Sequence, residues 1–106
     1  MILRVVKMKV DLRKIDAFKL FMDNLHDEKL RLAGCLHFDY FNERQNPSIY
    51  YSYTIWEHEK YLKQYKKTEF SKEVLQTLRD LCVEEPQAWT IQNVFNKPSD
   101  EDESNK

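Results

Sequence analysis

The segment 49–56, IYYSYTIW, most constrains the fold, because as a strand it has large apolar side chains on both of its faces. One face would carry Tyr51, Tyr53 and Ile55, and the other Tyr50, Ser52, Thr54 and Trp56. A strand with one face in water should instead alternate between apolar and polar residues. We therefore expect the chain's own helices to cover one face of the sheet and a second copy of the sheet to cover the other, in an isologous homodimer.

The order of the predicted elements indicates an α+β fold of the ferredoxin-like type. Sequence patterning predicts strands at residues 2–10, 35–41, 49–56 and 88–95, an amphipathic helix from residue 13 to Gly34, a short helix at 57–66 and a longer one from residue 68. Asp11 and Thr68 suit helix N-caps, and Gly34 suits a positive φ after the first long helix. The order β-α-β-β-α-β predicts a four-stranded antiparallel sheet with helices on one face.

Length and composition set the domain limits and exclude several classes of function. The 106 residues fit one domain at 1–95, and the acidic segment 96–106 is expected to be a disordered tail. The net charge of -1 does not favour nucleic acid or an anionic membrane as a partner. No signal segment or long apolar run is present, so we expect a cytoplasmic protein. A single glycine excludes glycine-rich phosphate loops, and the two cysteines, without a CxxC, predict neither a disulfide framework nor a metal site.

Several segments together resemble a known family. The first strand MILRVVKMKV, the segment GCLHFDYF, the run YSYTIWEHEKYLKQYKKTEF and the later AWTI are similar to the antibiotic biosynthesis monooxygenase family of dimeric α+β barrels. Gly34-Cys35-Leu36 at the entry to the second strand and Trp56-Glu57 at the end of the third carry most of the likeness, which extends over residues 1–95.

The resemblance implies a pocket between the sheet and the helices, capped by the helix after Trp56. Oxygenases of this family act without a flavin or metal on quinols or polyphenols, so no cofactor is expected. Trp56, Tyr53 and Phe38 are the candidates for binding such an aromatic substrate. Tyr65 is a candidate hydrogen-bond donor, His37 a candidate proton acceptor, and Trp56 is placed with them in the catalytic group. Many relatives have a histidine where this chain has Tyr65.

The sequence also bears on three alternatives to an oxygenase. A dimer of the same fold that binds a small molecule without turnover cannot be separated from it by sequence. The haem-degrading branch of the family uses a first-strand asparagine and a helical histidine; this chain lacks that asparagine and has Leu75 near the histidine position. RNA-recognition modules share the element order, but SIYYSYTIW lacks their basic and glycine residues. His26 and His58 lie in charged segments and are expected to be exposed.

Overall fold

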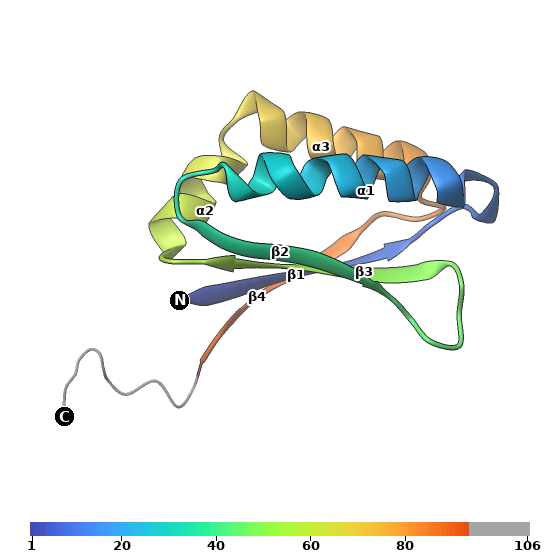
Figure 1. The fold of residues 1–106 in the computed structure, drawn as a ribbon, viewed down its shortest axis with the longest axis horizontal. Coiled ribbons are helices and arrows are strands. Elements are labelled where there is room, and N and C mark those ends of the chain that lie inside the picture. The colour runs from blue at the N-terminus through green and yellow to red at the C-terminus, as the bar shows by residue number, and fades with distance from the viewer. Residues whose placement is uncertain (94–106) are drawn as a thin grey trace.

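A computed structural model describes residues 1–93 and shows one sheet with helices on one side (Figure 1). The elements are β1 (Ile2–Lys9), the short 3-10 helix η1 (Leu12–Lys14), α1 (Ile15–Leu30), β2 (Cys35–Asn42), β3 (Ile49–Trp56), α2 (Glu59–Lys66), α3 (Glu69–Leu81) and β4 (Gln87–Gln92). This order confirms the predicted α+β fold. The predicted last strand extended to Phe95, and its final residues and the predicted tail at 96–106 lie outside the described residues.

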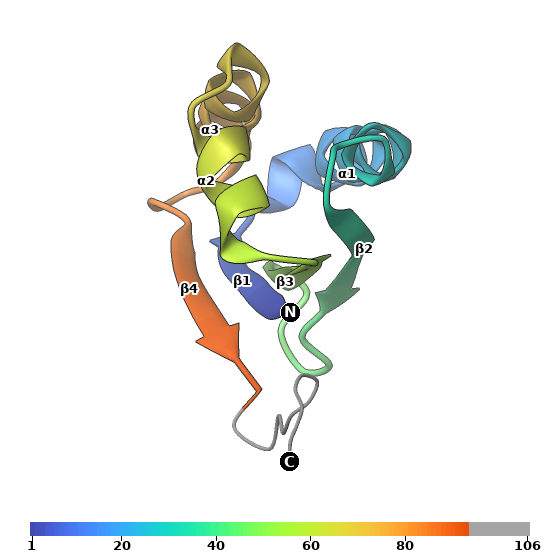
Figure 2. The same cartoon turned by 90° about the vertical axis from the view of Figure 1, so that its left-hand side faces the viewer.

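The sheet has the order β2-β3-β1-β4, and all three neighbouring pairs are antiparallel. Seen from one end, α1 lies on the β2 side and α3 on the β4 side, both above the same face of the sheet (Figure 2). We call this covered side the inner face. It carries the buried Met8, Phe38, Tyr50 and Trp56, which explains why large aromatic side chains lie on this face of the third strand.

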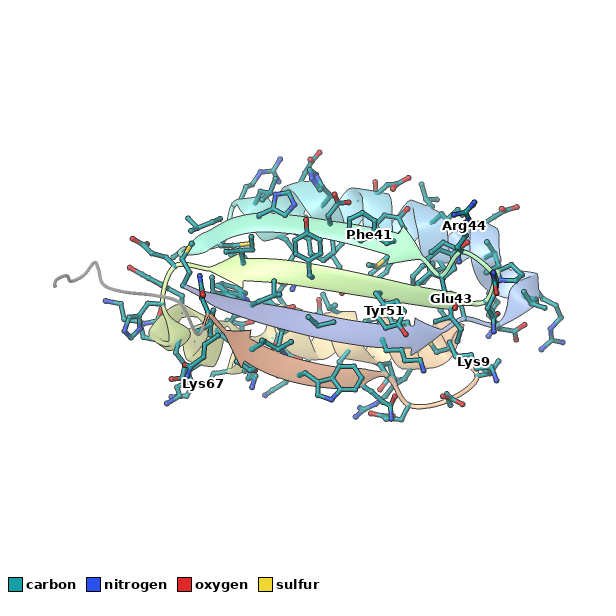
Figure 3. All side chains as sticks on the ribbon, turned by 90° about the horizontal axis from the view of Figure 1, so that it is seen from below. Lys9, Phe41, Glu43, Arg44, Tyr51 and Lys67 are labelled. Carbon is teal, nitrogen blue, oxygen red and sulfur yellow. The ribbon has the colours of Figure 1, made fainter. Side chains whose placement is uncertain are left out.

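The opposite side, which we call the outer face, has no helix of residues 1–93 over it (Figures 1 and 3). The registers place three rows of side chains across it: Phe41, Tyr51 and Lys7; Asp39, Tyr53, Val5 and Trp89; and His37, Ile55, Leu3 and Ile91. Phe41 and Tyr51 are visible there at the end of the sheet near the β2–β3 turn (Figure 3). Trp89 is 45% exposed in the single chain. The face is therefore rich in aromatic and aliphatic groups that no described element covers.

The ends of the helices follow local side-chain chemistry. The Thr68 hydroxyl accepts a hydrogen bond from the Ser71 N–H and caps α3, as predicted. The Asp11 carboxylate accepts one from the Arg13 backbone N–H, but it caps the 3-10 helix η1, and α1 itself begins at Ile15, two residues later than predicted. α2 begins two residues later than predicted, because the His58 ring accepts a hydrogen bond from the Lys60 N–H as its N-cap.

The prediction that α1 extends to Gly34 was wrong, whereas the positive φ of that glycine is confirmed. α1 ends at Leu30, and hydrogen bonds from the Leu32 N–H to the Lys29 carbonyl and from the Cys35 N–H to the Leu32 carbonyl turn the chain twice before β2. Gly34 has φ +78°, and its carbonyl accepts a hydrogen bond from the Glu57 N–H at 2.8 Å. The glycine therefore shapes the contact between the α1–β2 turn and the start of α2.

A β-bulge at the start of β2 changes which residues face the helices. Cys35 pairs with Trp56, but His37 pairs with the next residue, Ile55, so Leu36 is extra. Without the bulge, the alternation of a strand would place Leu36 on the same face as Phe38, and Cys35 on the same face as His37. The bulge overturns that grouping: Cys35 is buried with Phe38 on the inner side, while Leu36 is 52% exposed.

Candidate functional site

A cavity of about 320 Å³ lies between the inner face of the sheet and the three α-helices. This volume lies at the lower end of the range of about 300–1,000 Å³ for small-molecule pockets. The sheet contributes Arg4, Val6, Phe38, Ser52, Thr54, Trp56 and Ala88, while the helices contribute Met22, Leu25, Lys29, Leu62, Tyr65, Lys66, Ser71, Lys72, Val74, Leu75 and Leu78; Pro86 completes the lining. The α1 residues of this lining are buried, whereas Lys72, Leu75 and Ala88 are exposed. The cavity therefore opens on the side of α3 and β4.

Aromatic side chains form the part of the cavity next to α2. Trp56 is 1% exposed, and its ring centroid lies 5.5 Å from that of Tyr65. Phe38, on the neighbouring strand, is also buried and lines the same space. The indole Nε1 of Trp56 is buried and has no hydrogen-bond partner among residues 1–93. Three of the five predicted site residues, Trp56, Tyr65 and Phe38, thus lie together at one cavity.

The other two predicted site residues, His37 and Tyr53, do not line this cavity. They lie on the outer face, where their rings stack with centroids 5.2 Å apart, and Tyr53 also stacks on Phe41 at 5.6 Å. His37 Nε2 is 4.0 Å from Asp39 Oδ2, too far for a hydrogen bond. Sequence alternation could not tell which side of the sheet these residues face. The sheet itself separates them from Trp56 and Tyr65.

The Tyr65 hydroxyl is suited to donating a hydrogen bond. Burial, and to a smaller degree the nearby Cys35 thiol, raise the pKa of Tyr65 to about 12. The phenol therefore keeps its proton at neutral pH. No other side chain in the described part of the protein makes a hydrogen bond to this hydroxyl. A ligand in the cavity could therefore accept a hydrogen bond from the Tyr65 hydroxyl.

Lys29 is a cavity residue that sequence reasoning missed. It continues the stripe of α1 residues Phe18, Met22 and Leu25 that packs on the sheet, and it is only 8% exposed. Its Nζ lies 4.3 Å from the ring centroid of Tyr65. Desolvation by burial lowers the pKa of Lys29 to about 8. The available signal was a lysine at helical spacing on an otherwise apolar face, where its side chain must enter the core or bend away from it.

Three further cationic residues line the cavity: Arg4, Lys66 and Lys72. The Arg4 guanidinium donates a hydrogen bond to the Thr90 hydroxyl at 2.8 Å, and burial lowers its pKa. Desolvation and, secondarily, Arg4 lower the pKa of Lys66. The lining contains no Asp or Glu among the described residues. A cavity with this lining favours anions over cations.

The cavity also bears on metal and haem binding. Leu75, near the position where the haem-degrading branch has its histidine, lines the cavity with an aliphatic side chain. Within residues 1–93, no group of three or more His, Cys, Asp or Glu residues could hold a metal ion. His26 and His58 are exposed, as predicted.

None of the helices in the described region has the length and apolar character needed to cross a bilayer. The cytoplasmic location stays a prediction.

Comparison with known proteins places these features in a family. The family profile described as antibiotic biosynthesis monooxygenase matches residues 1–77. A candidate antibiotic biosynthesis monooxygenase from Nitrosomonas europaea is 21% identical, with a TM-score of 0.78 over 90% of this chain and 100% of that chain. A conserved protein from Methanosarcina mazei is 26% identical, with a TM-score of 0.78 over 87% of this chain and 92% of that chain. No curated protein matches the sequence significantly.

Proposed function

We propose, on the premise that the chain belongs to the antibiotic biosynthesis monooxygenase family, that it oxidises a quinol or polyphenol with O2 and without a bound cofactor. The observation that carries this proposal is the cavity lined by Trp56, Phe38 and Tyr65 between the sheet and the helices. Its aromatic walls suit a flat aromatic substrate, and its volume of about 320 Å³ suits one of two or three rings.

The reaction balances without an external reductant when the substrate is electron-rich. In the conversion of anthrone to anthraquinone, two C–H bonds at one carbon break, and one atom of O2 forms the new carbonyl. The other oxygen atom leaves as water with the two hydrogens, and the substrate supplies all four electrons. The protein's part would be to hold the ring system, exclude bulk water and stabilise the oxyanion of the deprotonated substrate. Tyr65, which keeps its proton at neutral pH, would donate a hydrogen bond to that oxygen.

Oxygen uptake on a panel of quinols and anthrones tests this function. We expect Tyr65→Phe to lower kcat/KM about tenfold, because one hydrogen bond to a developing oxyanion is worth about 1.5 kcal/mol. Trp56→Phe should also lower it, because the smaller ring leaves part of the cavity wall missing. Lys67→Met is the control, since Lys67 is exposed and does not line the cavity.

The possible outcomes separate the function from the site. No uptake above buffer with any substrate would contradict the oxygenase and favour a dimer that binds its ligand without turnover. Uptake that neither Tyr65→Phe nor Trp56→Phe lowers would leave the oxygenase in place and contradict the assignment of this cavity as its active site.

We also propose that two copies associate through their outer faces. Support comes from the aromatic and aliphatic rows on that face, including Tyr53, Trp89 and Ile91, which no element of the described chain covers. Large exposed apolar patches of this kind are typical of interaction surfaces. A second copy offers a matching sheet, and a two-fold axis would bury both faces at once. His37 and Tyr53 would then be interface residues.

Sedimentation velocity tests the dimer. We expect wild type to sediment as a dimer at micromolar concentration and Trp89→Ala to raise the dimer dissociation constant about 30-fold, because truncating an interface tryptophan typically costs about 2 kcal/mol. Leu20→Ala is the matched control, since Leu20 is an exposed apolar residue on α1, away from the outer face. A wild type that is monomeric at these concentrations would contradict the proposal.

A further inference from the structure

Lys29 is a buried charge that has no counterion in the described part of the protein. Within residues 1–93 it is the one charged residue that is buried, and no carboxylate lies within 4.0 Å of its ammonium group. The charged or titratable groups that act electrostatically on its ammonium are the Cys35 thiol and a second cation, Arg4. A buried ion is normally paired, because an unpaired charge loses its hydration without compensation. The folded chain therefore leaves this ammonium group in need of an anionic partner.

Three aromatic rings surround the Lys29 ammonium and give it partial compensation. Its Nζ lies 4.3 Å from the ring centroid of Tyr65, 5.4 Å from that of Phe38 and 6.0 Å from that of Trp56. Cation–π contacts stabilise a desolvated ammonium by less than full ion pairing does. These are the same three rings that line the cavity. An aromatic ligand among them would therefore come close to the ammonium group.

The charge distribution around the cavity also favours an anionic ligand. The chain as a whole has a net charge of -1, yet its cavity is lined by four cationic residues and, in the described region, by no acidic one. Arg4, Lys66 and Lys72 would attract an anion toward the opening, because charges of one sign around a cleft concentrate ions of the opposite sign. Ser52 and Thr54 add hydroxyl groups on the sheet side of the lining.

We propose that the cavity selects an aromatic anion, whose carboxylate or phenolate oxygen pairs with the Lys29 ammonium while its rings pack against Phe38, Trp56 and Tyr65. This inference rests on the proposed function and deepens it, because it names the charge of the substrate and the residue that recognises that charge. The Tyr65 hydroxyl donates to the same oxygen. Lys29 is thus a specificity residue of this chain.

Calorimetric titration with two ligands of the same shape tests the proposal without any turnover. The probes are 2-naphthoate, an anion at neutral pH, and naphthalene-2-carboxamide, its neutral counterpart. We expect wild type to bind 2-naphthoate at least tenfold more tightly at pH 7, because only the carboxylate pairs with the ammonium. 2,4-Dinitro-1-naphthol, which is a phenolate at pH 7 where Lys29 is still charged, tests a phenolate ligand in place of the carboxylate.

Substitutions at Lys29 separate its charge from its packing. Lys29→Met keeps an unbranched side chain and should remove the preference for 2-naphthoate, while changing the affinity for the carboxamide less than threefold. Lys29→Arg should restore part of the preference. Lys67→Met, which makes the same change in net charge outside the cavity, should leave both affinities unchanged. If Lys29 had a purely structural role, its substitution would instead change the affinity for both ligands equally.

The affinity for 2-naphthoate should also depend on pH. The pKa of Lys29 is about 8, so the ammonium is mostly charged at pH 7 and mostly neutral at pH 9. The dissociation constant should therefore rise about tenfold over this range, while that of the carboxamide stays constant. The other ionisable groups that face Lys29 or line its cavity are Arg4 on β1, Cys35 on β2, Tyr65 and Lys66 on α2 and Lys72 on α3. Lys66→Met should keep the pH dependence if it arises from Lys29.

Three results would overturn the proposal. They are equal binding of the two probes by wild type, a preference for 2-naphthoate that survives in Lys29→Met, and no binding of either probe up to millimolar concentration. Each can occur whether or not the protein consumes oxygen, so the ligand class and the oxygenase function fail separately.

Discussion

Lys29→Met is expected to raise the free energy of unfolding by about 3 kcal/mol at pH 7. Burial lowers the pKa of Lys29 from 10.5 to about 8, and a decrease of that size corresponds to a destabilisation of about 3 kcal/mol by the buried charge. Methionine has a similar length, needs no counterion and packs well against aromatic rings. Urea denaturation of the two proteins measures the difference, with Lys67→Met as the exposed control.

The gain in stability from Lys29→Met should decrease as the pH rises. Because the pKa of Lys29 is lower in the folded state, the unfolded chain binds more protons between pH 8 and 10.5. The destabilisation by Lys29 is thus complete below about pH 8 and disappears as the pH rises toward 10.5. The gain from Lys29→Met should therefore be largest at pH 7 and shrink at pH 9.5. A gain that does not change with pH, or a loss of stability at pH 7, would show that the buried charge is not the cause.

Taken with the binding test, this substitution distinguishes a functional lysine from a structural one. A residue kept for stability would weaken the fold when replaced. A residue kept for ligand binding would do the opposite, because binding sites often hold groups in environments that destabilise the free protein. We expect Lys29→Met to gain stability and lose the preference for an anion.

Gly34→Ala is expected to lower the free energy of unfolding by about 3 kcal/mol. At a φ of +78° an alanine is strained by roughly 1 kcal/mol relative to glycine. A Cβ at this position would also overlap the ring of Tyr61 on α2, so the helix or the turn would have to move. The Glu57 N–H that binds the Gly34 carbonyl would shift with them. Thermal or urea denaturation measures the loss.

A double substitution separates the two contributions. In a Tyr61→Gly background all three overlapping side-chain atoms, the Cβ included, are absent, so Gly34→Ala should then cost only about 1 kcal/mol, the part due to φ. Equal losses in both backgrounds would show that the Tyr61 ring moves aside freely. A loss below about 0.5 kcal/mol in the wild-type background would contradict the whole account.

Much of the site was accessible from sequence because it depends on order along the chain. The aromatic residue that closes the third strand and the helix that follows it must lie at one end of the sheet, which brought Trp56 and Tyr65 together. Phe38 on β2 faces the same side, next to Thr54 of β3. His37 and Tyr53 have side chains that suit a site equally well. Their positions along a strand, however, determine only which residues share a face with them, and not whether that face meets the helices.

The sequence by itself determined the order of strands and helices, the caps at Asp11 and Thr68 and the positive φ of Gly34, because each depends on side chains within a few residues. Tertiary structure alone decided which face of the sheet meets the helices, and the bulge at Leu36 then set the facing of the start of β2. It also decided that Lys29 lines a cavity in which the described residues offer it no carboxylate partner. The physical reason is that alternation and helical spacing define relative directions along one element, whereas burial and charge pairing depend on groups brought together from distant parts of the chain.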